Sequence, residues 1–229
     1  MTSRPASVLT DIEGTTTPIA FVHRTLFPFA RARLPAFLEQ HMANGAVASI
    51  IREVQSLAPD QPPLTTLLGW MDADAKVTPL KELQGLIWRE GYATGALHAE
   101  VYPDVADCLR SWQAGGVRLA VYSSGSVEAQ KQLFTHTRSG DLTGLFDGFF
   151  DTRIGAKREA DSYRAIAAGL ALPGEAILFL SDVEAELDAA EAAGLLTCQL
   201  IRAEDGTVAS TRHKVAADFT EVGAAFGLA

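Results

Sequence analysis

The chain has 229 residues, 48% of them hydrophobic, and can therefore bury a substantial core in one or two domains. Its 28 acidic residues outnumber its 19 Lys and Arg residues, for a formal net charge of −9. Because no basic run or basic-aromatic stripe accompanies this acidic balance, we expect no nucleic-acid partner. A phosphorylated small molecule is compatible with it, since a divalent cation and one lysine can reverse the charge of a single pocket.

The sequence also argues against a membrane span and a zinc site. No window comes near the roughly 18 uninterrupted apolar residues of a membrane span, and the first residues lack the pattern of a secretion signal. The five histidines show no HxH or HExxH spacing, and Cys108 and Cys198 form no CxxC pair, which favours two free thiols. We expect a cytoplasmic monomer that does not bind membranes.

Short apolar runs alternate with helical patterns along the chain, which is typical of a parallel sheet with helices on both faces. The predicted strands are Ser7–Thr10, Val117–Tyr122, Gly148–Phe150, Ile177–Leu180 and Thr197–Ile201. Helices are predicted at Val127–His136, Asp161–Ala171 and Val183–Ala193. The expected fold class is therefore α/β.

A long stretch without a convincing strand follows the first strand, from Pro18 to Asp104. Helices are predicted there at Thr25–Asn44, Ala46–Leu57, Thr65–Ala75 and Leu80–Ala96, with breaks at Pro59, Pro62 and Pro63. Pro103 is expected to open the helix that returns the chain to the sheet. We therefore expect a discontinuous α/β core, residues 1–17 and 105–229, and an inserted helical cap, residues 18–104. Such a cap could cover the carboxyl ends of the strands, where open α/β sheets bind ligands.

Chemistry is first expected at Asp11, Glu13 and Gly14, directly after the first apolar run. Alternate residues of a strand share one face, so the two carboxylates would start from the same side, and the glycine would let the chain turn. Carboxylates with the neighbouring threonine hydroxyls suit a hard cation and a phosphate. The alternative is a solvated turn.

A second candidate lies at Ser123 and Ser124, between the strand that ends at Tyr122 and the helix that begins near Val127. Hydroxyls and backbone N–H groups at a helix N-terminus can bind phosphate oxygens. The alternative is ordinary capping of the helix by a serine.

The remaining candidates are Lys157, in a loop after the third predicted strand, and Asp182, after the fourth. A lysine there could neutralise a phosphate and orient a carboxylate, although surface lysines are common. Asp182 would share the sheet edge with Asp11 and is a predicted metal ligand. Glu186, one helical turn later, is expected to support it, whereas Glu184 should lie on a solvated face.

The proposed ligands are all oxygen atoms, which favours magnesium over zinc. With one magnesium ion bound, Asp11 could attack phosphorus and form an aspartyl-phosphate that water then hydrolyses. Glu13 would protonate the leaving alkoxide and later activate the water.

These segments, in this order, resemble the haloacid dehalogenase superfamily of aspartyl-phosphate phosphatases, whose core is a Rossmann-like parallel sheet. Residues 11–22 are similar to the signature of the enolase-phosphatases of methionine salvage, in which Glu replaces the second Asp of the usual DxD motif. Residues 122–131, 149–157 and 181–186 resemble the later motifs of that family, and residues 88–95 resemble part of its cap. The similarity covers nearly the whole chain.

The resemblance implies a bifunctional enzyme acting on 2,3-diketo-5-methylthiopentyl-1-phosphate, by enolisation and then dephosphorylation to the acireductone. It further implies one magnesium ion for both steps, held by Asp11, Glu13 and Asp182, and substrate contacts from Ser123, Ser124 and Lys157. Glu13 would contribute its backbone carbonyl to the metal.

Two other functions are compatible with the core motifs. A general phosphatase of the same fold for small phosphoesters would accept unrelated sugar phosphates, although Glu13 departs from the usual pattern. A phosphate-responsive module without catalysis, similar to receiver domains, would also combine acids, hydroxyls and a lysine. The long insertion after the first strand speaks against the second of these, because such modules have a short connection there.

Overall fold

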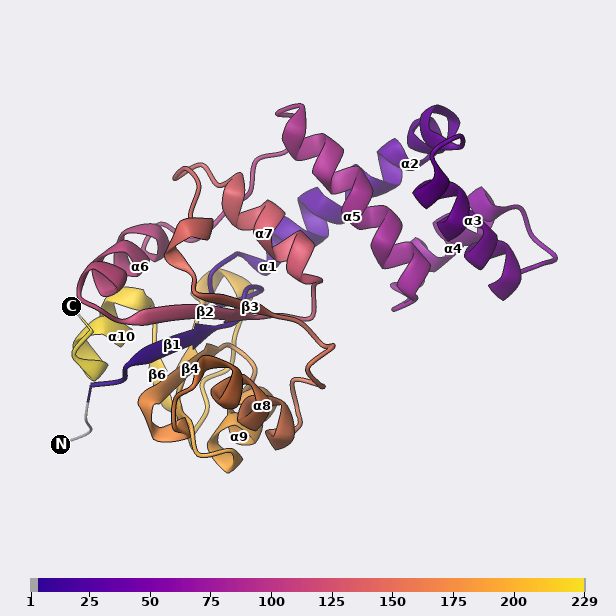
Figure 1. The fold of residues 1–229 in the computed structure, drawn as a ribbon. Helices are drawn as coiled ribbons and strands as arrows, with labels where there is room; N and C mark the ends of the chain where they lie inside the picture. Colours follow the sequence, from indigo (N-terminus) through magenta and orange to yellow (C-terminus); the bar gives the residue numbers. More distant parts are fainter. Residues whose placement is uncertain (1–3, 229) are drawn as a thin grey trace. The chain divides into compact units, whose positions relative to one another are not determined.

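The computed structural model describes residues 4–228. The chain divides into two compact units, Met1–Ile19 with Ala99–Ala229 and Ala20–His98 (Figure 1). From the sequence, the boundaries between the two units were expected between residues 17 and 18 and between residues 104 and 105. The α/β unit extends further at both junctions because Ile19 N donates to Asp205 Oδ2 at 3.2 Å and Tyr102 N donates to Thr16 O at 3.0 Å. The role of the helical unit as a cap stays a prediction.

The α/β unit is built on a six-stranded parallel sheet in the order β3-β2-β1-β4-β5-β6. The strands are β1 Ser7–Thr10, β2 Arg118–Tyr122, β3 Gly148–Phe150, β4 Ile177–Ser181, β5 Leu196–Leu200 and β6 Lys214–Ala216. The prediction of a parallel α/β sheet is confirmed. The sixth strand was not predicted, because Lys214 and Val215 of this short edge strand are exposed and the sequence there shows no apolar run.

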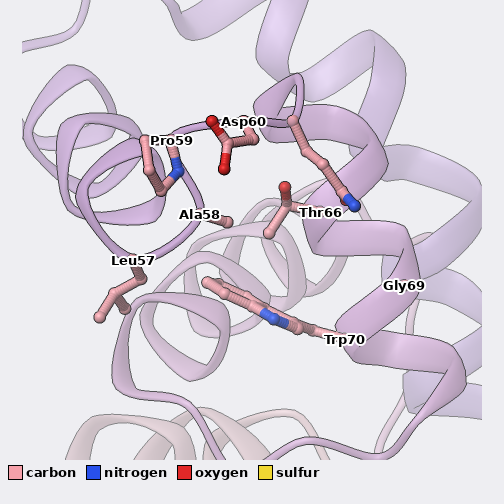
Figure 2. A pocket seen from close by; sticks show the side chains of 8 residues that line it. Leu57, Ala58, Pro59, Asp60, Thr66, Gly69 and Trp70 are labelled. Atoms are coloured by element: carbon pink, nitrogen blue, oxygen red, sulfur yellow. The ribbon is translucent and has the colours of Figure 1, made fainter.

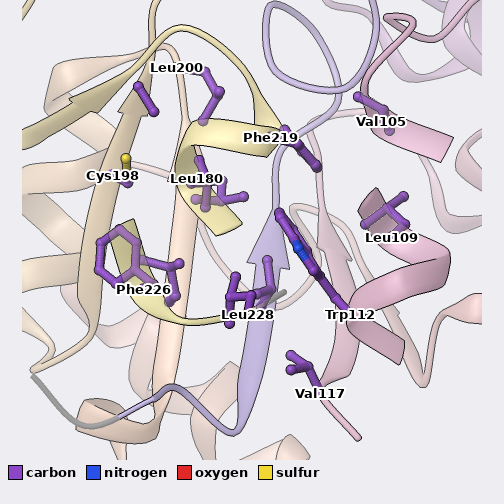
Figure 3. Packing of buried hydrophobic residues seen from close by; sticks show 14 of the residues in the cluster. Val105, Leu109, Trp112, Val117, Leu180, Cys198, Leu200, Phe219, Phe226 and Leu228 are labelled. Atoms are coloured by element: carbon purple, nitrogen blue, oxygen red, sulfur yellow. The ribbon is translucent and has the colours of Figure 1, made fainter. Parts of the chain in front are cut away.

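Helices cover both faces of this sheet, because successive strand residues point to opposite sides. In the α/β unit they are α6 Val105–Ala114, α7 Val127–Thr135, α8 Ala160–Leu170, α9 Glu184–Ala192 and α10 Phe219–Phe226, with the short 3-10 turns η2 Thr143–Leu145, η3 Gly174–Ala176 and η4 Ala203–Asp205. Figure 3 shows one face, where Trp112 of α6 and Phe219 of α10 pack with Leu180. On the other face Phe179 packs with Tyr163 of α8. The helices predicted between the strands are confirmed; α10 was not predicted.

The helical unit has its own apolar core. Its elements are α1 Ile19–Phe21, the π-helical turn η1 Val22–Leu26, α2 Phe27–His41, α3 Gly45–Leu57, α4 Pro63–Asp72 and α5 Thr78–Ala93, the first beginning at the junction with the α/β unit. Leu34, Val54, Leu67 and Leu83 come from four different helices and are fully buried together. Within residues 4–228, no helix is long and apolar enough to cross a membrane.

Candidate active site

The carboxyl edge of the sheet brings together the residues that follow its central strands. Thr10, the last residue of β1, lies in register with Val121 of β2 and Leu180 of β4. Asp11 comes next on the central strand and is buried, 4% exposed. Its backbone N donates to Leu180 O at 2.9 Å, which extends the sheet pairing by one residue, and its carboxylate Oδ1 accepts from Ile12 N at 2.7 Å.

Lys157 joins two carboxylates at this edge. Its Nζ lies 2.8 Å from Asp11 Oδ1 and 2.6 Å from Glu186 Oε2, and all three side chains are almost buried. Ser181 Oγ donates to the same Glu186 oxygen at 3.0 Å. Burial opposes the charge of Lys157, but the charges of Asp11 and Glu186 outweigh this effect and raise its pKa. The lysine is therefore held as a cation. We call Lys157, Asp11 and Glu186 the Lys157 cluster.

The loop that carries Lys157 is fixed by hydroxyl groups. Tyr163 OH donates to Lys157 O at 2.6 Å, and Ser162 Oγ donates to Ala156 O at 2.7 Å. Tyr122 OH donates to Gly155 O at 2.9 Å. These donors come from β2 and α8, so the sheet and a helix together hold the lysine in place.

Asp182 follows β4 at the same edge. Its Oδ1 is buried, and residues 4–228 provide it with no hydrogen-bond partner. Burial, with the negative charge of Asp11, raises its pKa to about 7. Gly14 has φ +68°, and a Cβ there would lie 2.5 Å from Asp182 Oδ2, so only glycine lets the turn approach this carboxylate.

Burial and the charge of Asp11 also raise the pKa of Glu186. Among residues 4–228, no group of three His, Cys, Asp or Glu side chains forms a ready metal site. Even so, a buried carboxylate oxygen without a donor, beside a second carboxylate, is suited to a divalent cation with oxygen ligands. The residues at this edge therefore fit such an ion, bound with the help of water or substrate oxygens.

Glu13 and Asp11 do not occupy equivalent positions. The strand β1 ends at Thr10, so the alternation of side chains along the strand does not extend to Glu13. Glu13 is exposed and lies in the turn after Asp11. The turn is closed by Gly14 N donating to Thr17 O at 2.8 Å. Glu13 is therefore exposed to solvent, whereas Asp11 is buried.

The two predicted serines differ in the same way. Ser123 is buried, and its Oγ accepts from Gly125 N at 3.2 Å, whereas Ser124 is exposed. The capping of α7 that was weighed as an alternative is carried out by Ser126, whose Oγ accepts from Ala129 N. The hydroxyls of Ser123 and Ser124 are thus not used as the cap.

Asp151 is a residue of this edge to which the sequence analysis gave no role. It follows β3, is 7% exposed, and accepts from Val127 N at 3.2 Å and Arg153 N at 2.9 Å. It therefore ties the start of α7 to the loop that leads to Lys157. Its position in the sequence could have revealed it, because Asp151 directly follows a predicted strand, as Asp11 and Asp182 do.

Glu184 lies apart from these groups, as predicted. It makes an ion pair with Arg212 at 2.9 Å, and both side chains are exposed. The Ser210 hydroxyl donates to the same carboxylate.

A hollow of about 380 Å³ lies in the helical unit, between the end of α3 and α4 (Figure 2). Leu57, Asp60, Thr66 and Trp70 are among the residues that line it. The predicted site residues lie elsewhere, in the α/β unit.

The α/β unit is an open parallel sheet with a buried carboxylate, Asp11, directly after its strand β1, which is an arrangement suited to a hydrolase. The model of the haloacid dehalogenase-like hydrolases matches residues 6–194. A protein of Granulibacter bethesdensis named Enolase-phosphatase E1 is 60% identical over 98% of this chain and 97% of its own. One of the same name from Gluconacetobacter diazotrophicus is 58% identical over 97% and 94%. The chain therefore belongs to the haloacid dehalogenase-like hydrolases and, within them, to the enolase-phosphatases.

A solved structure supports the same fold. The UTR4 protein of Saccharomyces cerevisiae is 34% identical, with a TM-score of 0.81 over 93% of this chain and 98% of its own. The chain is thus a phosphatase by family, and hydrolases of this family generally use a divalent metal ion.

Proposed function

We propose that the protein converts 2,3-diketo-5-methylthiopentyl-1-phosphate to its enol phosphate and then to the acireductone and phosphate, as a step of methionine salvage. The observation that carries this proposal is the Asp11 carboxylate, which is buried at the end of β1 and ion-paired with Lys157 at 2.8 Å. The relatives that are 58–60% identical and bear the name Enolase-phosphatase E1 support the choice of substrate.

In the phosphatase step, Asp11 is the nucleophile. One of its oxygens attacks phosphorus, the bond from phosphorus to the substrate oxygen breaks, and Glu13 gives the leaving oxygen a proton. Water then attacks the aspartyl-phosphate, Glu13 takes a proton from it, and phosphate leaves with Asp11 restored. Lys157 holds the Asp11 carboxylate in an ion pair and neutralises charge on the phosphoryl oxygens.

Ser123 and Ser124 are proposed to contact the phosphate group. Ser123 stands at the end of β2, beside the start of α7, and Ser124 is exposed next to it. Hydroxyls and backbone N–H groups at this place can donate to phosphate oxygens.

A single magnesium ion is proposed at Asp11, Glu13 and Asp182, with Glu186 supporting the arrangement through Lys157 and Ser181. The unpaired Asp182 Oδ1 supports this assignment. When bound, the ion supplies positive charge for the phosphate and polarises the ketone oxygen of the substrate. Glu13, whose side chain is one methylene longer than Asp, is our candidate for the base that removes the C–H proton in the enolisation.

The direct test is Asp11→Asn. We expect phosphate release from the diketone phosphate to be lost while the fold is kept, because an amide is a far weaker nucleophile than a carboxylate. Glu184→Gln is the matched control, since it removes an exposed carboxylate that is paired with Arg212 and lies outside the site, and it should leave turnover unchanged. Normal turnover in Asp11→Asn would remove Asp11 from its role.

A panel of phosphoesters separates the proposal from a general phosphatase. We expect turnover of the diketone phosphate, with transient absorbance of the enol, to exceed turnover of unrelated sugar phosphates by orders of magnitude. Comparable rates across the panel would favour the general phosphatase. Steady release of phosphate excludes a module that responds to phosphate without catalysis.

We also propose that the protein is a cytoplasmic monomer. Cys108 and Cys198 are both free, which fits a reducing compartment. The large hydrophobic side chains that are most exposed in residues 4–228, Met42, Leu57, Val208 and Val215, belong to separate segments. Sedimentation at micromolar concentration should give the mass of one chain, and a dimer mass would contradict the proposal.

A further inference from the structure

Arg202 is a buried cation that none of the candidate motifs contains. It stands two residues after β5 and is 4% exposed. Its Nε and Nη2 both donate to the backbone oxygen of Thr15, at 3.2 and 2.8 Å. The guanidinium of Arg202 thus binds the turn that follows Asp11 through the backbone carbonyl of Thr15.

The guanidinium is itself fixed from two sides. Asp104 accepts from Nη1 at 2.9 Å and from Nη2 at 3.0 Å, in a bidentate pair. The Tyr102 ring lies with its centroid 3.9 Å from Cζ of Arg202. Asp104 also accepts from Phe219 N at 2.8 Å, which anchors the carboxylate to α10. We call Arg202, Asp104 and Tyr102 the Arg202 cluster.

This geometry uses the planar fork of arginine. Nη1 and Nη2 pair with the Asp104 carboxylate, Nε and Nη2 donate to Thr15 O, and Nη1 also donates to Ala217 O at 3.4 Å. The flat face of the guanidinium lies against the Tyr102 ring. A lysine offers a point charge and cannot make these contacts together. The arrangement therefore depends on arginine in particular rather than on a positive charge in general.

Thr15 is coupled to the reacting groups through a tight turn. Thr15 N and Thr16 N both donate to Ile12 O, and Tyr102 N donates to Thr16 O at 3.0 Å. Gly14, within the same turn, lies against the carboxylate of Asp182. If Thr15 O lost its donors, the turn could shift, and Asp11 and Gly14 would shift with it.

We propose that Arg202 is a positioning residue for the reaction, which holds the turn of residues 12–17 so that Asp11 stays aligned with Lys157 and Asp182. This inference rests on the proposed role of Asp11 as the nucleophile. Arg202 does not touch the substrate. Its effect passes through Thr15 O, so its loss should slow the chemical step more than it weakens substrate binding.

The experiment compares Arg202→Met, Arg202→Lys and Asp104→Asn with a variant that only loses packing. Val222→Ala removes two methyl groups from the same apolar core, where Val222 is fully buried on α10. Phosphate release is measured well below each unfolding temperature, and kcat and KM are determined separately. A purely structural role would make kcat follow stability, and Val222→Ala would then lose as much activity as the Arg202 variants at equal stability.

We expect kcat to fall about 100-fold in Arg202→Met and about 10-fold in Arg202→Lys and Asp104→Asn, because small misplacements of a reacting group cost up to about 100-fold. KM should stay within about threefold, and Val222→Ala should keep kcat within about twofold. If Arg202→Met does not fold, the other two variants decide the outcome.

Unchanged kcat in Arg202→Lys and Asp104→Asn, with Asp11→Asn inactive, would overturn the inference and leave the proposed function intact. Activity in Asp11→Asn would instead contradict the proposed function itself. The two failures are therefore distinguishable.

Discussion

The Arg202 cluster buries a cation beside one carboxylate and the Lys157 cluster buries a cation between two, so the two clusters differ in how fully their charges are matched. At Arg202, both oxygens of Asp104 are paired, and one also accepts a backbone N–H. At Lys157, one ammonium serves Asp11 and Glu186.

Around Lys157, where the charges are not fully matched, the pKa values of nearby carboxylates are raised. Burial and the charge of Asp11 raise the pKa of both Glu186 and Asp182, and Asp182 Oδ1 has no partner in residues 4–228. A saturated ion pair holds its surroundings in place, whereas a group of charges with an excess of carboxylates retains affinity for a cation. This difference in charge matching distinguishes the Arg202 cluster, which we propose positions the turn, from the Lys157 cluster, which we propose takes part in the reaction.

The largest effect is expected from Lys157→Met. Asp11 and Glu186 would be left buried without a cation, so the free energy of unfolding should fall by about 3–5 kcal/mol. Phosphate release should fall by about 100- to 1,000-fold, since a charge aimed at the phosphoryl oxygens is lost. Urea denaturation and a phosphate assay measure the two losses.

The double variant Lys157→Met with Glu186→Gln is the control for this prediction. Removing one buried negative charge should restore part of the stability and none of the activity. If the double variant were no more stable than Lys157→Met, the carboxylates would not be the cause of the loss.

A pair of single variants sharpens the contrast between the clusters. Asp104→Asn breaks a saturated pair and should destabilise the protein by about 3 kcal/mol. Glu186→Gln removes a carboxylate that Asp11 repels, so its stability should stay within about 1 kcal/mol of the wild type. Thermal or urea unfolding of both variants provides the comparison, and equal losses would erase the proposed difference.

A smaller effect is expected from Gly14→Ala. The left-handed backbone at φ +68° should cost about 1–2 kcal/mol, and the new Cβ would press on Asp182 Oδ2. Gly227→Ala is the matched control, because Gly227 has φ +65° and open space around its Cβ position. Both variants should lose stability, but phosphate release should fall in Gly14→Ala alone.

The smallest effect is expected at Asp141, an exposed carboxylate whose pKa is lowered by hydrogen bonds from the Thr143 hydroxyl and backbone N. A carboxyl with a lowered folded-state pKa stabilises above its ordinary pKa, and this contribution is lost as pH falls through the lowered value. Asp141→Asn should therefore be slightly less stable than wild type at pH 7 and equal to it in strong acid. Urea unfolding at both pH values tests this, and turnover should not change.

Much of the site could be predicted because it follows local rules. A residue directly after an apolar strand lies at the carboxyl edge of a parallel sheet, and this rule led to Asp11 and Asp182. Glu186 was predicted from helical spacing alone, and the structure places it against Lys157 at 2.6 Å. The spacing could not show that Lys157 contacts Asp11, because that contact depends on how the loop after β3 folds back.

Other features depended on long-range contacts. The edge strand β6 and the helix α10 were not predicted from the sequence. β6 is defined by its pairing with β5, and α10 by its packing on one face of the sheet. Arg202 meets Thr15 across 187 positions of the chain and Asp104 across 98, so no local spacing could reveal either contact.

The sequence by itself determined the α/β class, the order of the motifs and most of the charged groups at the sheet edge, because strand ends and helical turns have fixed periodicities. Only the tertiary structure decided which of those charges are matched. Burial and pairing arise when distant segments pack together, and these contacts leave Asp182 Oδ1 unpaired while Arg202 is fully engaged.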